Sequence, residues 1–115
     1  MVKAKFETTD NEKTLILTVQ GHAGAAQSGE DTVCAAASIL AYTAAQEVKE
    51  MQEKGKLKKK PNIRLDEGDA TITCKPVKNA YSEALHTFKV VQTGYRLLAA
   101  NFPENVSLTT FAKDN

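Results

Sequence analysis

The first twenty residues alternate between apolar and polar side chains, with a short interruption. In residues 2–8, apolar residues at every second position are separated by Lys3, Lys5 and Glu7. The same period of two returns in residues 14–19, after the polar stretch 10–13. A period of two is typical of a half-buried strand, so the pattern predicts a hairpin of two strands.

The spacing of apolar residues changes to steps of three and four after residue 30, which is the period of a helix. This apolar stripe consists of Val33, Ala37, Leu40, Ala44, Val48 and Met51. It predicts a helix of about six turns, with Gly55 as the cap that ends it.

The rest of the chain gives a second set of elements after a lysine-rich connection that Pro61 closes. Two short strands are expected on either side of the turn 67–69, followed by a second helix and a last strand. In order, the ranges are the connection 54–60, the strands 63–66 and 70–75, the helix 79–100 and the strand 106–110.

The predicted order is β-β-α-β-β-α-β, which indicates an α+β fold. Each helix has one apolar stripe and each strand one apolar row, so we expect a two-layer sandwich with both helices packed on one face of a small, mostly antiparallel sheet. A chain of 115 residues has room for one core, so residues 1–115 are expected to form a single domain. On the uncovered face Ile16 would contribute to an apolar patch, which favours a dimer.

Composition narrows the choice of partners. The net charge is +1 with 25% charged residues, so no global field favours nucleic acid or a membrane, and no direct nucleic-acid partner is expected. No segment approaches the run of roughly 18 apolar residues that a membrane span requires, and no apolar run follows the first lysines, so a cytoplasmic location is expected. Without a secretion signal, the two cysteines are expected to be free thiols.

The stretch that carries chemistry is 21–38, between the end of a strand and the start of the first helix. Gly21, Gly24 and Gly29 leave few side chains to fix this loop, so another backbone can approach it closely. We therefore expect a loop that becomes ordered around a bound chain.

His22 and Cys34 flank this loop, and an imidazole that accepts the proton of a thiol makes the thiol a nucleophile. If Asp31 caps the helix, Cys34 is the third helical residue, where the dipole favours a thiolate. If Ser28 is the cap, the effect is smaller.

Other interpretations of these residues remain open from spacing alone. A single cysteine near a helix start is usually inert and packed, and a single histidine after a strand is usually solvated. A phosphate loop would need a lysine that is missing here. A metal site built from His22, Cys34, Cys74 and His86 lacks paired spacing, so neither a metal nor a cofactor is expected. The lysines of 54–60 are interpreted as a solvated connection, although they could touch RNA.

Taken together, Gly21-His22-Ala23-Gly24, Gly29, Asp31, Val33-Cys34-Ala35-Ala36 and Ser38 resemble the signature of the ribosomal-processing cysteine protease family, Prp. Gly94-Tyr95, Leu98-Ala99 and Phe102-Pro103 are similar to the pattern that this family has near its last helix. The resemblance implies a dimeric cytoplasmic endopeptidase (a hydrolase) that removes a short N-terminal extension from a large-subunit ribosomal protein.

The resemblance also assigns roles to residues. It implies that His22 is the base and Cys34 the nucleophile, with Asp31 orienting the helix start and Ser38 supporting the site. The lysine-rich connection departs from the compact middle of ribosomal-processing members. A phage or prophage relative that processes a capsid or scaffolding protein is therefore the alternative, and a non-catalytic ribosome- or RNA-associated module is the alternative from another class.

Overall fold

The computed structural model describes residues 1–9, 13–21 and 30–113, with the side chains of 30–31 and 111–113 outside the described part. His22, Gly24 and Gly29 therefore lie outside the described residues. The elements are β1 (Val2–Thr9), β2 (Thr14–Gln20), α1 (Glu30–Glu53), β3 (Asn62–Asp66), β4 (Asp69–Cys74), the 3₁₀ turn η1 (Lys78–Ala80), α2 (Tyr81–Asn101) and β5 (Val106–Lys113).

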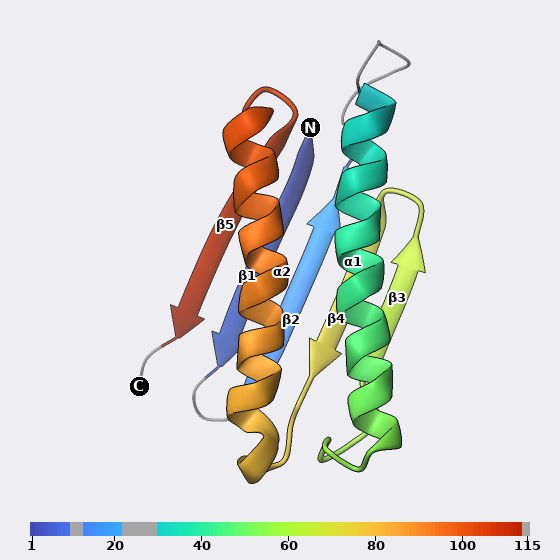
Figure 1. Ribbon diagram of the computed structural model, residues 1–115, viewed down its shortest axis with the longest axis vertical. Helices are drawn as coiled ribbons and strands as arrows, with labels where there is room; N and C mark the ends of the chain where they lie inside the picture. The colour runs from blue at the N-terminus through green and yellow to red at the C-terminus, as the bar shows by residue number, and fades with distance from the viewer. Residues whose placement is uncertain (10–12, 22–29, 114–115) are drawn as a thin grey trace.

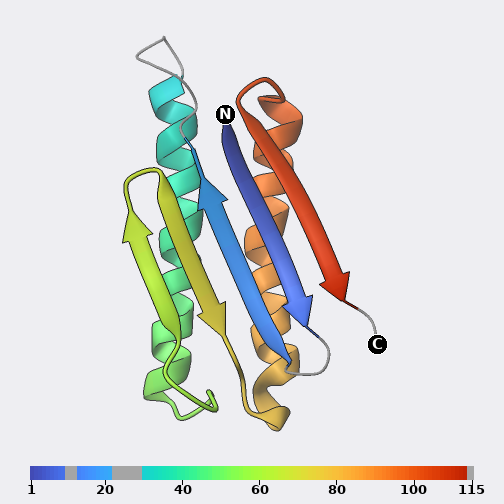
Figure 2. The ribbon, with the colours of Figure 1, turned by 180° about the vertical axis from the view of Figure 1, so that it is seen from behind.

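The five strands form one sheet in the order β3-β4-β2-β1-β5, and both helices lie on one face of it (Figures 1 and 2). The β1–β2, β2–β4 and β3–β4 pairs are antiparallel, while β1 and β5 are parallel. The predicted α+β architecture, its element order and its mostly antiparallel sheet are confirmed.

The core lies between the sheet and the two helices, where the apolar rows of the strands meet the apolar stripes of the helices. Leu15, Leu17 and Ile72 are fully buried on the sheet side. The Phe6 ring of β1 meets the Phe88 and Tyr95 rings of α2 edge to face, with centroids 6.4 Å and 6.0 Å apart. Such aromatic pairs add to the free energy gained from burial and fix α2 against the middle of the sheet.

Helix α1 ends in a two-bond cap at Gly55, as the sequence predicts. Gly55 has a positive φ of 71°, its N–H donates to the Gln52 carbonyl, and the Lys56 N–H donates to the Met51 carbonyl. These are the two hydrogen bonds of the Schellman motif, which favours glycine because of the left-handed conformation.

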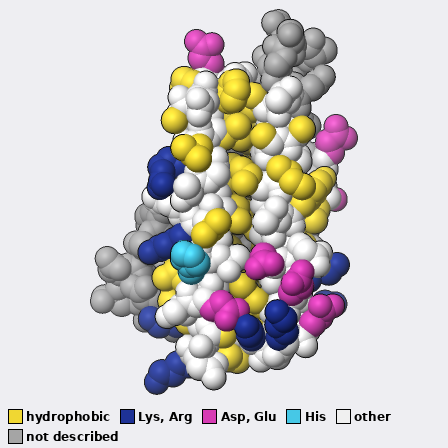
Figure 3. All heavy atoms as spheres, viewed as in Figure 1, with side chains coloured by type: hydrophobic (Ala, Val, Ile, Leu, Met, Phe, Trp, Pro, Cys, Tyr) yellow, Lys and Arg dark blue, Asp and Glu magenta, His cyan; other side chains and the backbone are white. Residues whose placement is uncertain are grey.

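The helix-free face of the sheet differs from the expected apolar patch. Its rows alternate with the buried rows, and their described side chains on the inner strands are lysine, glutamate, aspartate, glutamine and threonine, with Ile16 the one apolar exception. Exposed apolar side chains occur instead on the helix layer, at Ile39 of α1 and at Val90 and Leu97 of α2. Figure 3 shows apolar atoms along both helices on that face.

The two helices of the described residues have polar and charged stretches, and neither has the length and apolar content needed to cross a membrane.

Candidate active site

A cavity of about 700 Å³ opens between the first half of α1 and the turn that joins β3 to β4. Three parts of the chain form its wall: α1, the adjacent ends of β1 and β2, and the β3–β4 turn with the residues beside it. The lining residues are Val2, Val19, Gly21, Cys34, Ala35, Ala37, Ser38, Ala41, Tyr42, Leu65, Asp66, Glu67, Gly68, Asp69 and Ala70. Many of those on α1 are alanines, so the helix leaves room for a bound chain.

Gly21 forms one corner of this cavity, and only glycine fits there. Its φ is 95°, and a Cβ at this position would collide with the backbone carbonyl oxygen of Met1. Its N–H donates to the Gly68 carbonyl at 2.9 Å. The end of β2 is therefore held between the start of the chain and the β3–β4 turn, and His22 is the next residue in the sequence.

Cys34 lies one turn inside α1 and lines the cavity. Its side chain is half-buried, and it packs against the edge of the core. Because α1 begins at Glu30, Cys34 is the fifth helical residue. Asp31 is the second helical residue and not the cap that one interpretation placed there.

This earlier helix start changes the electrostatic expectation for Cys34. The helix dipole acts mainly within the first turn, so its effect at the fifth residue is weaker than at the third. Asp31 lies within the first turn, where a negative charge is favourable to the helix dipole.

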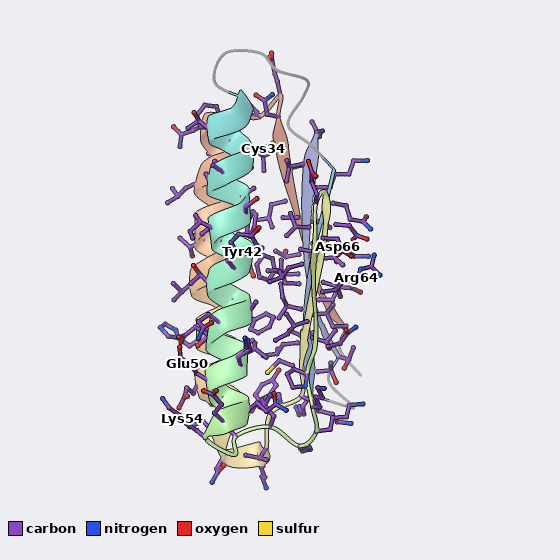
Figure 4. All side chains as sticks on the ribbon, turned by 90° about the vertical axis from the view of Figure 1, so that its right-hand side faces the viewer. Cys34, Tyr42, Glu50, Lys54, Arg64 and Asp66 are labelled. Carbon is purple, nitrogen blue, oxygen red and sulfur yellow. The ribbon has the colours of Figure 1, made fainter. Side chains whose placement is uncertain are left out.

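Ser38 and Tyr42 follow Cys34 along the same side of α1. Residues four apart in a helix lie one above the other, and all three side chains line the cavity. Tyr42 is 52% exposed, so much of its ring is accessible to a bound chain. Figure 4 shows Cys34 and Tyr42 on α1, and Asp66 and Arg64 on the sheet. Because Ile63 pairs with the buried Ile72, the next side chain, Arg64, lies on the face of the sheet away from the helices.

The β3–β4 turn supplies the opposite wall, and sequence reasoning missed it. Arg64 forms ion pairs with Asp66, at 3.0 Å from Nε to Oδ2, and with Asp69. Both pairs are exposed, so they add little to stability, and they connect the ends of the two strands that flank the turn in the cavity wall. The sequence 67–69 indicates only a turn, and no pattern in it points toward Cys34.

Tyr42 could have been found from sequence, because it lies two helical turns after Cys34 at the spacing that Ser38 already marks. The i, i+4, i+8 relation is a sufficient signal for a shared helix face.

Helix α2 holds the cavity side of α1 in place. The buried Tyr95 hydroxyl donates to the Ala37 carbonyl at 2.7 Å, one turn after Cys34. Gly94 lets α1 approach closely, since a Cβ there would lie 2.5 Å from the Cδ2 atom of Leu40. The close approach at Gly94 and the hydrogen bond of Tyr95 are therefore the physical roles of these two adjacent residues of α2.

The other reactive side chains lie away from this cavity. Cys74 is 1% exposed and lies at the far end of β4 in the core, as expected, where burial raises the pKa of its thiol to about 11. His86 is exposed on α2. Within residues 1–9, 13–21 and 30–113, no group of three histidine, cysteine or acidic side chains is placed to hold a metal ion.

Known proteins share this arrangement. The family model described as cysteine protease Prp matches residues 1–107. A search of curated proteins found no match.

Solved structures are similar over nearly the whole chain. SMU.848 from Streptococcus mutans is 23% identical, with a TM-score of 0.70, covering 98% of this chain and 96% of that one. The essential ribosomal processing protease Prp from S. aureus, bound to a covalently linked product peptide, is 21% identical, with a TM-score of 0.66, covering 96% and 99%. The same S. aureus protease with a substrate peptide is 19% identical, with a TM-score of 0.67 and the same coverage.

These structures share the fold, and the family model covers most of the sequence. The chain therefore belongs to the cysteine protease Prp family.

Proposed function

We propose that this cysteine protease removes a short N-terminal extension from a large-subunit ribosomal protein, with Cys34 as nucleophile and His22 as general base. The observation that carries the proposal is the half-buried Cys34 thiol in the wall of a cavity of about 700 Å³. A cavity of this size accommodates several residues of an extended peptide.

The reaction is an acyl transfer in two halves. His22 accepts the Cys34 proton, and the sulfur attacks the carbonyl carbon of the scissile bond to form a tetrahedral intermediate. The C–N bond breaks, His22 protonates the departing amine, and a thioester remains on Cys34. Water, deprotonated by His22, then displaces the sulfur and releases the carboxylate product.

Helix α1 supplies the electrostatic part of this scheme. The first N–H groups of a helix have no acceptor within the helix, so those of the first turn are the donors that we assign to the oxyanion. Asp31 orients this turn, and Ser38 supports the site from the next turn on the same face.

The loop that carries Gly21, Gly24 and Gly29 becomes ordered around the substrate in this scheme. Gly21 supports this part of the proposal, because it lines the cavity and its N–H donates to the Gly68 carbonyl of the β3–β4 turn. A peptide in the cavity would contact both the loop and the β3–β4 turn.

The choice of substrate is supported by the S. aureus relatives, which are described as ribosomal processing proteases in complex with peptides. A capsid or scaffolding protein of a phage or prophage remains the second candidate. The lysine-rich connection, which departs from the ribosomal-processing pattern, is the observation that favours it. Family membership argues against the non-catalytic module.

A cleavage assay tests the proposal. The purified protein is incubated with two peptides, one from the extension of the ribosomal protein and one from a capsid-assembly protein, and fragment masses are measured. We expect one internal cut in the ribosomal peptide, at least a thousandfold slower with Cys34→Ala or His22→Ala. Cys74→Ala is the matched control, since it removes the other thiol and should keep the rate.

Equal cleavage by Cys34→Ala would refute the nucleophile. Cleavage of the capsid-assembly peptide alone would move the substrate to the second candidate.

The oligomeric state and location follow from the same resemblance. We propose a cytoplasmic homodimer, and sedimentation equilibrium at micromolar concentration checks the dimer directly.

A further inference from the structure

Backbone hydrogen bonds join the lysine-rich connection to the residues that follow β4. The Lys58 N–H donates to the Lys75 carbonyl and the Val77 N–H donates to the Lys56 carbonyl, both at 2.8 Å. Leu57 forms an antiparallel bridge with Pro76, and Leu57 packs against the core while Pro76 is fully buried. The backbone of the connection is therefore held next to residues 75–77 by these contacts.

This pairing gathers lysines that are distant in the sequence. We call them the lysine ribbon: Lys58, Lys59, Lys60, Lys75 and Lys78. In the sequence, only the run 54–60 is visible as a lysine cluster, and from it no direct nucleic-acid partner is expected. The structure adds the two lysines that follow β4 to this run.

The lysines of the ribbon differ from their neighbour Lys56 in their ion pairing among the described residues. The neighbouring Lys56 is neutralised by Glu83, whose carboxylate oxygen lies 2.7 Å from its Nζ atom. None of the five ribbon lysines forms such a pair with a carboxylate in the described part of the chain. Like charges held close together repel one another, so this surface is favourable for a polyanion.

A hollow of about 220 Å³ lies within the ribbon. Lys59, Lys60 and Lys75 line it together with Thr14 and Thr73. Ammonium and hydroxyl groups are donors to phosphate oxygens, and a hollow of this size holds one phosphate group of a longer chain.

The surroundings favour nucleic acid over other anionic partners. The large exposed apolar side chains of the described residues all lie outside 54–61 and 75–78. Stable membrane anchoring needs an apolar contact in addition to positive charge, and these segments do not provide one among their described side chains. The ribbon contains lysines and no arginine. Lysine binds phosphate as a point charge, whereas arginine forms bidentate hydrogen bonds with carboxylates.

We propose that the lysine ribbon binds the phosphate backbone of RNA. The choice of RNA over DNA rests on the proposed function, because a ribosomal protein is a substrate that can be bound to RNA when it is cut. The binding itself does not depend on the cleavage reaction.

The lysine ribbon and the cavity lie at opposite ends of α1. Lys54, at the ribbon end, is 20 residues beyond Cys34, which is about 30 Å along a helix. RNA on the ribbon therefore leaves the cavity open, and one molecule can hold RNA and a peptide together.

Fluorescence anisotropy with a labelled single-stranded RNA tests this, over a range of salt concentrations. With four or five phosphates contacted, the slope of log K against log salt is expected to be about −3. Lys58→Gln, Lys59→Gln and Lys60→Gln combined should weaken binding at least tenfold and make the slope shallower by about 2.

The matched control is Lys3→Gln, Lys49→Gln and Lys89→Gln combined. These three lysines are also exposed, and their replacement changes the net charge by the same amount. It should leave the affinity within about threefold, since it removes only long-range attraction. Cys34→Ala should bind RNA like the unaltered chain, which separates this proposal from the failure of the proteolytic one.

Several results would overturn the proposal. One is the absence of RNA binding at 50 mM salt, about the lowest ionic strength at which such contacts are usually compared. Another is equal weakening in the two triple variants, because net charge alone would then explain the binding. Tighter binding of a DNA duplex, polyglutamate or anionic vesicles than of RNA would refute the choice of partner.

Discussion

The two cysteines show how two regions of one small core give the same side chain opposite properties. Cys34 lies near the start of α1, half-buried, in the wall of an open cavity. Cys74 lies at the end of β4, fully covered by the core, and its burial raises the pKa of its thiol to about 11. Residue type therefore identifies two possible nucleophiles, and only the surroundings distinguish them.

The difference has a physical cause in how the elements cover the sheet. At the Cys74 end, β4 is paired with β2, with Leu15 opposite Cys74. At the Cys34 end, small residues on α1 and the short β3–β4 turn leave space between the two layers. The fold thus places a sealed core and an open site in the same two layers.

The largest expected effect is on thiol alkylation. At pH 8 we expect iodoacetamide to modify Cys34 at least a hundredfold faster than Cys74. Raising the pKa of Cys74 by about two units lowers its thiolate fraction about a hundredfold, and burial slows access further. Peptide mass mapping over time measures both rates in one sample, and comparable rates would remove the contrast between the two regions.

The next effect is on stability at high pH. The folded Cys74 thiol keeps its proton up to about pH 11, while its ordinary pKa is 9.0. The contribution of this protonated thiol to the free energy of unfolding is therefore fully present below pH 9. It is lost as the pH rises toward 11, by up to about 3 kcal/mol. Urea unfolding at several pH values measures this loss.

The control for this prediction is Cys74→Ala, which should lack that part of the pH dependence. Burial also raises the pKa of Tyr95, so stability still falls at high pH in this variant. A curve identical to that of the unaltered chain would show that Cys74 is not the titrating group.

Much of the sealed region could be predicted from sequence, because burial imposes periodicity. The alternation around Phe6 and Leu17 and the stripe through Val48 identify buried faces correctly, and Gly55 marks the end of α1. The order of strands in the sheet was not predicted, since the pairing of β5 with β1 brings together opposite ends of the chain.

The open site could be predicted only in part. Cys34 and Ser38 share a helical spacing, so their common face follows from sequence. Asp66 and Glu67 are brought to the same cavity by the β3–β4 pairing, and the lysine ribbon forms by the pairing of Leu57 with Pro76. Such contacts between distant segments leave no local pattern.

A smaller effect is expected from enlarging Gly94, the position at which α2 lies closest to Leu40 of α1 without a side chain of its own. Gly94→Val should lower the free energy of unfolding by about 1–3 kcal/mol, because its side chain enters the space of Leu40. Chemical denaturation measures the change. Combining it with Leu40→Ala should cost less than the sum of the two single changes, and simple additivity would mean that the two side chains do not compete for space.

The smallest effect concerns the hydrogen bond that holds α1 one turn beyond Cys34. Tyr95→Phe removes the hydroxyl that donates to the Ala37 carbonyl and should cost about 1 kcal/mol, since that carbonyl keeps its acceptor role within the helix. Because the bond lies on the cavity side, the loss should change the alkylation rate of Cys34 by a few fold and leave that of Cys74 unchanged. Equal changes at both thiols would indicate a loss of global stability, whereas a change confined to Cys34 would show that Tyr95 positions the turn that presents the nucleophile.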